Sequence, residues 1–333
     1  MSSPEHLGAT MREMAYYEAK LEGLREILAA DERVHLLGGS FLSLSPHRGL
    51  FQEISRAFRE RVISPPISEL GFCGLAVGAA MAGLRPVVDL STGSFIFEAW
   101  PQVVNEAANA LYMSGGQTRA PVVFHIFHGI RGGGAAQHSH SPQAMLWNCP
   151  GLEIVLPSSP SDVKGLLKTA VNTDNPTIFV DHVQLLETRG PVPDHDEAIP
   201  FGVADIKRVG SDVTVIATSY MVQRCLTVAH RLASEGIQVE VVDPRTLVPF
   251  DFQTLMASVE RTRRVVIVDE CHQSCGVAAE IAARIGEAGF DKLKAPIRRV
   301  TTLDLPVPYS EPLEEFISPS ESRISDAIRA VLR

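Results

Sequence analysis

The chain alternates short apolar runs with longer amphipathic runs, and this alternation limits its fold more than any other feature of the sequence. The apolar runs are residues 34–37, 85–90, 121–127, 152–157, 177–181, 213–217, 239–243, 265–268 and 296–300. Runs that are apolar on both faces are typical of parallel strands in a sheet that helices cover on both sides. The sequence therefore predicts an α/β fold with parallel sheets.

Helical periodicity fills most of the segments between these runs. We expect helices over residues 11–30, 49–60, 74–82, 99–112, 160–172, 221–236, 252–261, 276–288 and 321–332. The first of them follows the capping-box spacing Thr10-x-x-Glu13, which places its start at Met11. Functional loops are expected at the carboxyl ends of the parallel strands.

The length of 333 residues predicts two domains, because a single hydrophobic core seldom grows to this size. Residues 189–200 are rich in proline and acidic side chains and show no periodicity, so we interpret them as a linker. The domains are then residues 1–188 and 201–333, and the second repeats the alternating pattern on a smaller scale.

Composition and charge exclude several classes of protein. The formal net charge of −9 argues against nucleic acid as a partner, because phosphate binding requires clustered Lys and Arg. The N-terminus lacks the apolar core of a signal peptide and no window approaches ~18 uncharged apolar residues, so we expect a cytoplasmic protein that does not cross a membrane. The five cysteines are expected to be reduced. Cys271 and Cys275 do not have the spacing of a zinc site.

Glu69 begins the least polar stretch of the chain. It follows Pro65 and Pro66, and the run from Gly74 to Ala82 after it has no polar side chain on any face. Such a helix is predicted to pack against protein on all sides. Burial disfavours the ionised form of a carboxyl group at its start and the helix N-terminus favours it, so either effect tunes the acidity of Glu69. The alternative is a carboxylate that only caps backbone amides.

Four histidines lie in or just before a glycine-rich segment, residues 129–140. They are His125, His128, His138 and His140. The segment lacks the ending of a P-loop and the spacing of a dinucleotide fingerprint, so its glycines are interpreted as permitting close approach of a ligand or subunit. A metal ion shared by His138 and His140 is not expected. Proton transfer by at least one of these histidines remains a hypothesis, because histidine titrates near neutrality.

Several short motifs occur together and in one order. They are Pro66-Ile67-Ser68-Glu69-x-Gly71, Tyr112-Met113-Ser114-Gly115-Gly116, Ala136-Gln137-His138-Ser139, Asp174-Asn175-Pro176, Asp243-Pro244-Arg245-Thr246-Leu247 and Pro306-Val307-Pro308-Tyr309. In this combination nearly the whole chain resembles the beta subunit of the thiamine-diphosphate-dependent decarboxylating component of 2-oxo-acid dehydrogenases, in particular the pyruvate and acetoin dehydrogenase branch. The resemblance implies a pyrimidine-binding domain followed by a transketolase C-terminal-like domain.

The same resemblance implies cofactors and partners. The expected assembly is an α2β2 heterotetramer with the active site between α and β chains. In the family, a Gly-Asp-Gly motif of the alpha subunit holds the diphosphate of thiamine diphosphate and its Mg²⁺, and this chain has no such motif. A small, pyruvate-like 2-oxo acid is the expected substrate, and a dihydrolipoyl acyltransferase core is a further expected partner.

Site residues follow by the same resemblance. Glu69 hydrogen-bonds the ring nitrogen of the aminopyrimidine, which favours the imino tautomer that deprotonates the thiazolium carbon. Phe95 lies against the pyrimidine ring, and His138 faces the reacting carbon, where it stabilises charge or moves protons. Ser91 stands where a Met often contacts the pyrimidine. Some members bind potassium through backbone at the positions of Ala170, Thr173 and Asn175.

The sequence also departs from the family pattern. Gly39 and Ser40 stand where the family usually has acids that line a path between the two cofactors, and His125-Ile126-Phe127 replaces the usual Arg-Gly-Pro. Three hypotheses remain. The chain is a decarboxylating subunit with its own keto substrate and acceptor, a split transketolase or acyloin-forming carboligase subunit, or a non-catalytic scaffold.

Overall fold

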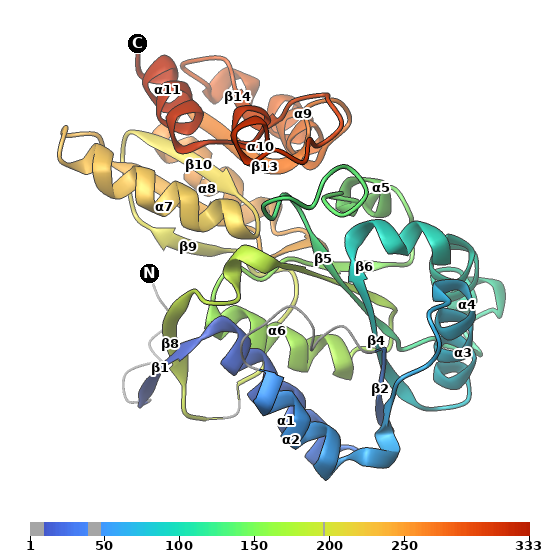
Figure 1. Cartoon of the computed structure of the whole chain (residues 1–333). Helices are drawn as coiled ribbons and strands as arrows, with labels where there is room; N and C mark the ends of the chain where they lie inside the picture. The colour runs from blue at the N-terminus through green and yellow to red at the C-terminus, as the bar shows by residue number, and fades with distance from the viewer. Residues whose placement is uncertain (1–9, 39–47, 196) are drawn as a thin grey trace.

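The computed structural model describes residues 10–38, 48–195 and 197–333, and it confirms the α/β fold (Figure 1). Within these residues the larger sheet has seven strands in the order β12-β6-β7-β5-β4-β2-β3. They are β2 (Val34–Leu37), β3 (Val62–Ile63), β4 (Arg85–Thr92), β5 (Val123–His128), β6 (Glu153–Val155), β7 (Thr177–His182) and β12 (Thr246–Val248). Neighbours are parallel except β12, which runs antiparallel to β6. The carboxyl ends of β4, β5 and β7 therefore share one edge.

The smaller sheet, of the second half of the chain, has the order β14-β13-β10-β11-β9. Its strands are β9 (Asp205–Arg208), β10 (Val213–Ala217), β11 (Val239–Asp243), β13 (Val265–His272) and β14 (Arg298–Thr302). Only β9 runs antiparallel to its neighbour in this sheet. The expected alternation of strand and helix is thus present in both halves.

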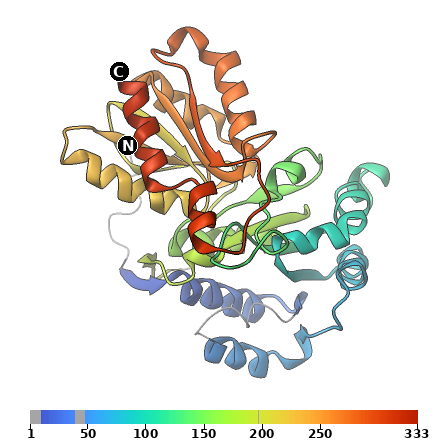
Figure 2. The same cartoon turned by 45° about the horizontal axis from the view of Figure 1, so that its top comes forward.

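Helices cover both sheets, as two views show (Figures 1 and 2). They are α1 (Tyr16–Ala30), α2 (Arg48–Ala57), α3 (Glu69–Met81), α4 (Ala110–Met113), α5 (Gln143–Trp147), α6 (Pro160–Asn172), α7 (Tyr220–Ala233), α8 (Phe252–Thr262), α9 (Val277–Gly289), α10 (Glu311–Ile317) and α11 (Glu321–Leu332). The helices predicted over 160–172 and 321–332 are confirmed to the residue. Along the described chain no helix is long and apolar enough to span a membrane.

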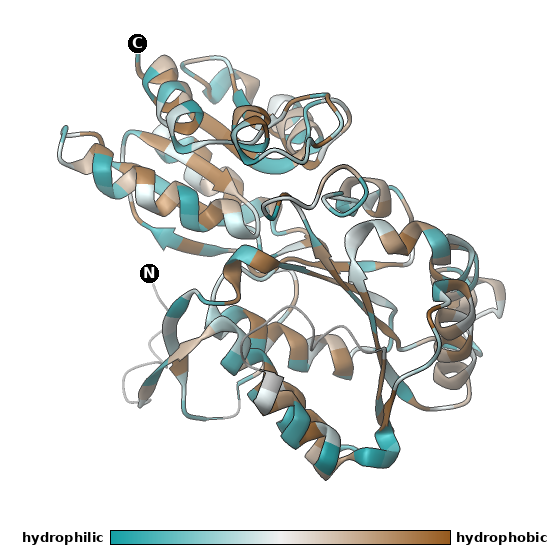
Figure 3. Cartoon of the chain, in the orientation of Figure 1, coloured by the Kyte–Doolittle hydropathy of each residue, from teal (hydrophilic) through white to brown (hydrophobic). Residues whose placement is uncertain are grey.

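The two faces of the larger sheet build separate cores, because successive side chains of a strand point to opposite faces. Val87 and Val123 pack with helices α1 and α6, whereas Val88 and Phe124 pack with α3. The core on the α3 side of the sheet continues into the other half of the chain through Leu247 of β12. In Figure 3 the inner strands are largely hydrophobic and the hydrophilic residues gather on outer faces of helices.

The predicted start of the first helix is wrong. Met11–Ala15 forms strand β1, which pairs antiparallel with β8 (Arg189–Pro193), and α1 begins only at Tyr16. The first amide of the turn, Ala15 N–H, donates to Glu18 Oε2 at 2.8 Å, so the capping carboxylate is Glu18 and not Glu13. Strand β8 lies within residues 189–200, the segment interpreted as the linker, so the first part of that segment is ordered by its pairing with β1. A partner strand so distant in sequence leaves no local signal.

The helix predicted over 99–112 is interrupted. Residues Gly93–Ala99 form the 3₁₀ segment η4, Pro101–Ala107 forms the π-helical segment η5, and only Ala110–Met113 is a short α-helix. Single π-helical turns occur frequently at functional sites. Here the irregular stretch follows β4 directly and carries Phe95.

Helix α3 is not enclosed on all sides in this chain. Phe72, Cys73 and Ala76 lie in the core, but Ile67 before the helix is 93% exposed and Leu75 within it is 58% exposed. The prediction of complete burial is therefore wrong for the isolated chain. An exposed apolar helix face of this kind marks a surface that another protein chain can cover. The replaced positions Gly39 and Ser40 lie outside the described residues.

Candidate active site

Phe95 and His138 meet at the carboxyl edge of the larger sheet. Phe95 lies in η4 after β4, and His138 ends the glycine-rich loop after β5. Their ring centroids are 5.5 Å apart and the ring planes are nearly perpendicular, at 86°. The Ser94 hydroxyl donates to the carbonyl of Gln137, which ties the two segments together. The structure thus brings together two of the predicted site residues, 43 positions apart in sequence.

Glu69 is the first residue of α3, a helix that packs against η4. Its carboxylate is half-buried and, among the described residues, accepts no hydrogen bond and forms no ion pair. The alternative interpretation, a carboxylate that only caps the helix, is therefore not supported by any hydrogen bond among these residues. Burial, with a smaller contribution from the Glu69 charge, raises the pKa of the Cys73 thiol to about 12, so that thiol stays protonated.

Ser91 and the expected potassium residues occupy different edges of the larger sheet. Ser91 lies near the end of β4 in the left-handed region, φ 62°, and its N–H donates to Asp89 Oδ1 at 3.0 Å. Ala170, Thr173 and Asn175 lie around the C-terminal end of α6. There Arg85, at the start of β4, donates to the Thr173 carbonyl at 2.7 Å. These three residues are thus on the far side of the sheet from Phe95.

The structure separates the four clustered histidines into different settings. His138 contacts Phe95 and His140 contacts Phe97, each ring edge to face. His128 lies beside His182, with ring centroids 5.0 Å apart. Burial, helped by the nearby His182, lowers the pKa of His128 to about 3, so this imidazole is neutral at physiological pH.

His125 belongs to a buried polar network that the sequence did not reveal. Its Nδ1 is 2.9 Å from Asp89 Oδ1 and its Nε2 is 2.8 Å from Asp181 Oδ2. Lys20 Nζ completes the network, 2.5 Å from the same Asp181 oxygen. Although burial opposes ionisation, Lys20 and His125 hold the pKa of Asp181 well below its usual range. Because four segments that are distant in sequence contribute to it, no local motif predicts this network.

Two carboxylates of the second half hold the glycine-rich loop. Ile130 N–H donates to Glu270 Oε1 at 2.8 Å, and Gly133 N–H donates to both oxygens of Glu314 at 3.1 Å. Gly129, with φ +86°, allows this approach, because a Cβ there would lie only 2.5 Å from Glu270 Oε2. The loop that carries His138 is therefore fixed at its start by the second half of the chain.

Arg131 and Ser139 of the same loop have unused hydrogen-bonding capacity. Arg131 is half-buried, has no hydrogen bond or ion pair among the described residues, and burial lowers the pKa of its guanidinium. The Ser139 hydroxyl is buried without a hydrogen-bond partner. Both side chains lie against Gly134. A desolvated cation without a counter-charge favours binding of an anion.

Comparison with known proteins matches both halves of the chain. The family model described as transketolase, pyrimidine binding domain, matches residues 12–188, and transketolase, C-terminal domain, matches residues 202–324. A solved structure titled "Split gene transketolase, inactive beta4 tetramer" superposes with a TM-score of 0.75 at 22% identity. It covers 96% of this chain and 98% of its own, and it shows the fold alone.

Curated relatives are more similar in sequence. The pyruvate dehydrogenase E1 component subunit beta of Rickettsia felis is 41% identical over 94% of this chain and 97% of that protein. The acetoin:2,6-dichlorophenolindophenol oxidoreductase subunit beta of Bacillus subtilis is 41% identical over 83% of this chain and 80% of that protein. The mitochondrial pyruvate dehydrogenase E1 beta subunit of Bos taurus is 40% identical over 99% of this chain and 92% of that protein.

Fold, site and family models together define a two-domain protein of the transketolase type. The chain belongs to the family of beta subunits of thiamine-diphosphate-dependent 2-oxo-acid dehydrogenases, in the pyruvate and acetoin dehydrogenase branch. This finding confirms the family predicted from the ordered motifs.

Proposed function

We propose that the chain is the beta subunit of a heterotetrameric thiamine-diphosphate-dependent enzyme. It decarboxylates a pyruvate-like 2-oxo acid and passes the acyl group to a lipoyl group of an acyltransferase partner. The observation that carries this proposal is the meeting of Phe95 and His138 beside the helix that Glu69 begins. The exposed apolar face of α3 supports an alpha partner chain next to the site.

The residues of this chain fit the aminopyrimidine half of the cofactor. The Glu69 carboxylate forms no hydrogen bond or ion pair with residues 10–38, 48–195 or 197–333, and Phe95 offers an aromatic ring beside a histidine. No Gly-Asp-Gly motif is present, so an alpha subunit would hold the diphosphate and Mg²⁺. When bound, thiamine diphosphate supplies the electron sink that decarboxylation requires.

Each side chain then has a defined task. Glu69 holds a proton between its carboxylate and the pyrimidine ring nitrogen, which orients the ring and sets its tautomer. Phe95 packs against the ring and excludes water. His138 holds a proton at the imidazole nitrogen that faces the substrate, and donates it as negative charge develops or takes it up during acyl transfer.

Potassium fits the structure less well. Arg85 donates to the carbonyls of Val171 and Thr173, at 2.9 and 2.7 Å, so a permanent positive charge already lies among the groups expected to bind the ion. No step of the proposed reaction depends on potassium.

Arg131 supports an acidic substrate. Its half-buried guanidinium, without a partner among the described residues, lies in the loop that carries His138, and a carboxylate is a group that a guanidinium pairs with through two hydrogen bonds. A neutral acyloin, such as the acetoin in the name of the Bacillus subtilis relative, would leave this charge unpaired. The carboligase and scaffold alternatives have no comparable observation in their favour.

The variant Glu69→Gln tests the proposal. We expect the tetramer formed with the alpha chain to assemble normally while 2-oxo-acid turnover falls by about 10²–10⁴-fold, because Gln cannot share a proton with the ring nitrogen. Gel filtration reports the assembly, and reduction of a lipoyl domain reports the turnover. Glu287→Gln, an exposed carboxylate on α9, is the matched control and should leave both unchanged. Unchanged turnover in Glu69→Gln would contradict the role of Glu69.

A further inference from the structure

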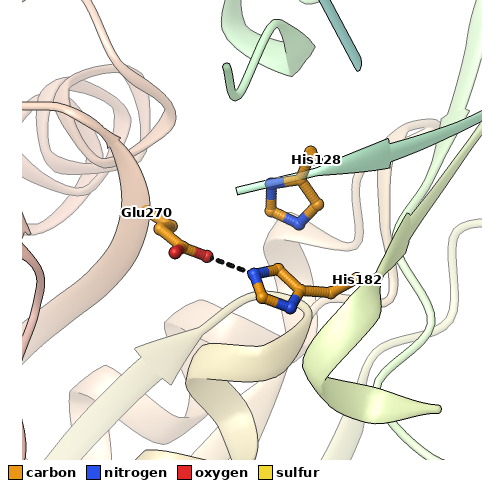
Figure 4. A group of neighbouring side chains, drawn as sticks. All are labelled: His128, His182 and Glu270. Carbon is orange, nitrogen blue, oxygen red and sulfur yellow. Dashed lines mark hydrogen bonds and ion pairs between the residues drawn. The ribbon is translucent and has the colours of Figure 1, made fainter. Parts of the chain in front are cut away.

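We propose that His128, His182 and Glu270 form a binding site for a divalent transition-metal ion of the Zn²⁺ class (Figure 4). The three side chains point toward one another from three different strands, β5, β7 and β13. This site is separate from the proposed catalytic residues, and the inference does not depend on the proposed function.

The distances suit a small ion. One ligand atom from each residue lies within 4.8 Å of the others, and His182 Nε2 is already 2.8 Å from Glu270 Oε2. Zinc–ligand bonds of about 2.0–2.1 Å place tetrahedral ligand atoms roughly 3.3 Å apart, so closure shortens the longest separation by at most about 1.5 Å. All three residues are buried, with exposed fractions of 2%, 0% and 5%.

The backbone holds the two imidazoles in place before any ion binds. His128 and His182 end the neighbouring parallel strands β5 and β7 and stand opposite each other in register. Glu270 is held from the other side, because its second oxygen accepts the N–H of Ile130. Ser219 Oγ lies 3.0 Å from His128 Nε2. It can serve as the fourth ligand itself, or it can position a water molecule that does so.

A second observation points to a ligand at His128. Its Nδ1 is 3.1 Å from Ser141 Oγ and 3.4 Å from Gln143 Nε2, whereas the buried Gln143 Oε1 has no hydrogen-bond partner in the part of the chain that the structure describes. A half-turn of the Gln143 amide places Oε1 where it accepts a proton from Nδ1, and the lone pair of His128 Nε2 then faces the cluster. Metal-bound histidines almost always donate their other N–H to such an acceptor.

Binding requires one tautomeric change at His182. In the present arrangement its Nδ1 accepts the N–H of Gln184 at 3.1 Å, which places the imidazole proton on Nε2, toward Glu270. When the ion takes Nε2, this proton moves to Nδ1 and the ring stays neutral. The bond from the Gln184 N–H is then lost, and the two N–H groups have to turn away from each other.

The ligand set selects the class of ion. Two imidazoles and one carboxylate suit Zn²⁺, Co²⁺ or Ni²⁺, whereas Mg²⁺ and Ca²⁺ prefer all-oxygen sites. A bound ion would join both halves of the chain at the start of the loop that carries His138.

Metal titration of the purified full-length chain tests the site. After treatment with a chelator, the chain is equilibrated with Zn²⁺ and passed over a desalting column, and retained metal is measured by mass spectrometry. We expect one Zn²⁺ per chain with a Kd below about 1 µM, and no retention of Mg²⁺. His182→Ala and Glu270→Gln should each weaken binding by about 100-fold or more, and Gln143→Leu by about 10-fold or more.

His230→Ala, an exposed histidine on α7, is the matched control and should bind as the wild type does. Retention of less than half an equivalent by the wild type overturns the proposal, as does unchanged binding in both His182→Ala and Glu270→Gln. If those two variants fail to fold, Co²⁺ added to the wild type decides. The intense visible bands of tetrahedral Co²⁺ with nitrogen and oxygen ligands support the site, and their absence overturns it.

Discussion

The carboxyl ends of the two sheets use their polar side chains in opposite ways. At the edge of the larger sheet, no described hydrogen bond engages the side chains of Glu69 and His138. At the edge of the smaller sheet, Asp269 and Glu270 are buried and bonded. Thr218 donates to Asp269 at 2.5 Å, and Ile130 N–H donates to Glu270. The larger sheet presents groups to a ligand, and the smaller sheet positions the loop that carries one of them.

Removing His138 should break this comparison on the side of the larger sheet. We expect His138→Ala in the assembled enzyme to lower acyl transfer by about 10²–10⁴-fold, because the proton donor at the reacting carbon is lost. Cofactor affinity should stay close to that of the wild type, since Phe95 and Glu69 remain. Stopped-flow transfer to a lipoyl domain and calorimetric titration with thiamine diphosphate measure the two quantities. Unchanged acyl transfer, or loss of cofactor binding, would argue against the assignment.

The network beneath the site sharpens the comparison through stability. Lys20→Met removes the lysine from the fully buried Asp181, which keeps only His125 and Tyr16 as side-chain partners among the described residues, and breaking such a buried pair costs about 3–5 kcal/mol. Denaturant unfolding measures this loss. The control Lys292→Met makes the same substitution in an exposed ion pair with Glu260, and it should change stability little. Equal effects of the two substitutions would show that the buried network does not support the larger sheet.

Glu314 tests whether the second half positions the loop. Glu314→Gln weakens the hydrogen bonds from Gly133 N–H, so we expect kcat to fall about tenfold with KM and cofactor affinity nearly unchanged. Amide hydrogen exchange of residues 129–137 should become faster. Glu311→Gln, on the same helix and exposed, serves as the control. A change in KM alone, with unaltered exchange, would contradict a positioning role.

The smallest effect is expected at the ion cluster between the halves. Burial acts to raise the pKa of Asp162, but Lys207 and Arg245 outweigh it and lower this pKa to about 2. Because the pKa is lowered on folding, the carboxylate stabilises the fold at pH values above its pKa in the unfolded chain, about 3.9. This stability is lost as the pH falls toward 2. Asp162→Asn should therefore flatten the decline of the melting temperature between pH 5 and pH 3, as thermal unfolding would show. An unaltered pH profile would contradict this role.

The sequence predicted the parts of the fold that have local signals. The strand over 213–217 and the helix over 321–332 follow from periodicity, and both occur as expected. β1 and β8 could not be predicted, because each is a strand only through pairing with the other. Helix α3 is a similar case. Its apolar pattern predicts burial on all sides, but part of its surface is exposed in the isolated chain.

For the site, the resemblance to the family predicted Phe95 and His138, and the structure places their rings together. The groups around them were not predictable in this way. Glu270 and Glu314 reach the loop from positions more than 130 residues away, and an acidic residue in a strand or helix carries no local sign of such a contact. Arg131 is present in the sequence, but only the structure shows that the described part of the chain places no counter-charge beside it.

Strand β12 has a consequence for how the chain folds. Because Thr246–Val248 completes the larger sheet beside β6, a fragment ending near residue 188 would leave the backbone of β6 unpaired at an open edge. Such edges recruit other chains and promote aggregation. The two homology-defined modules therefore share one sheet, and truncation or modular exchange at their boundary would have to carry β12 along.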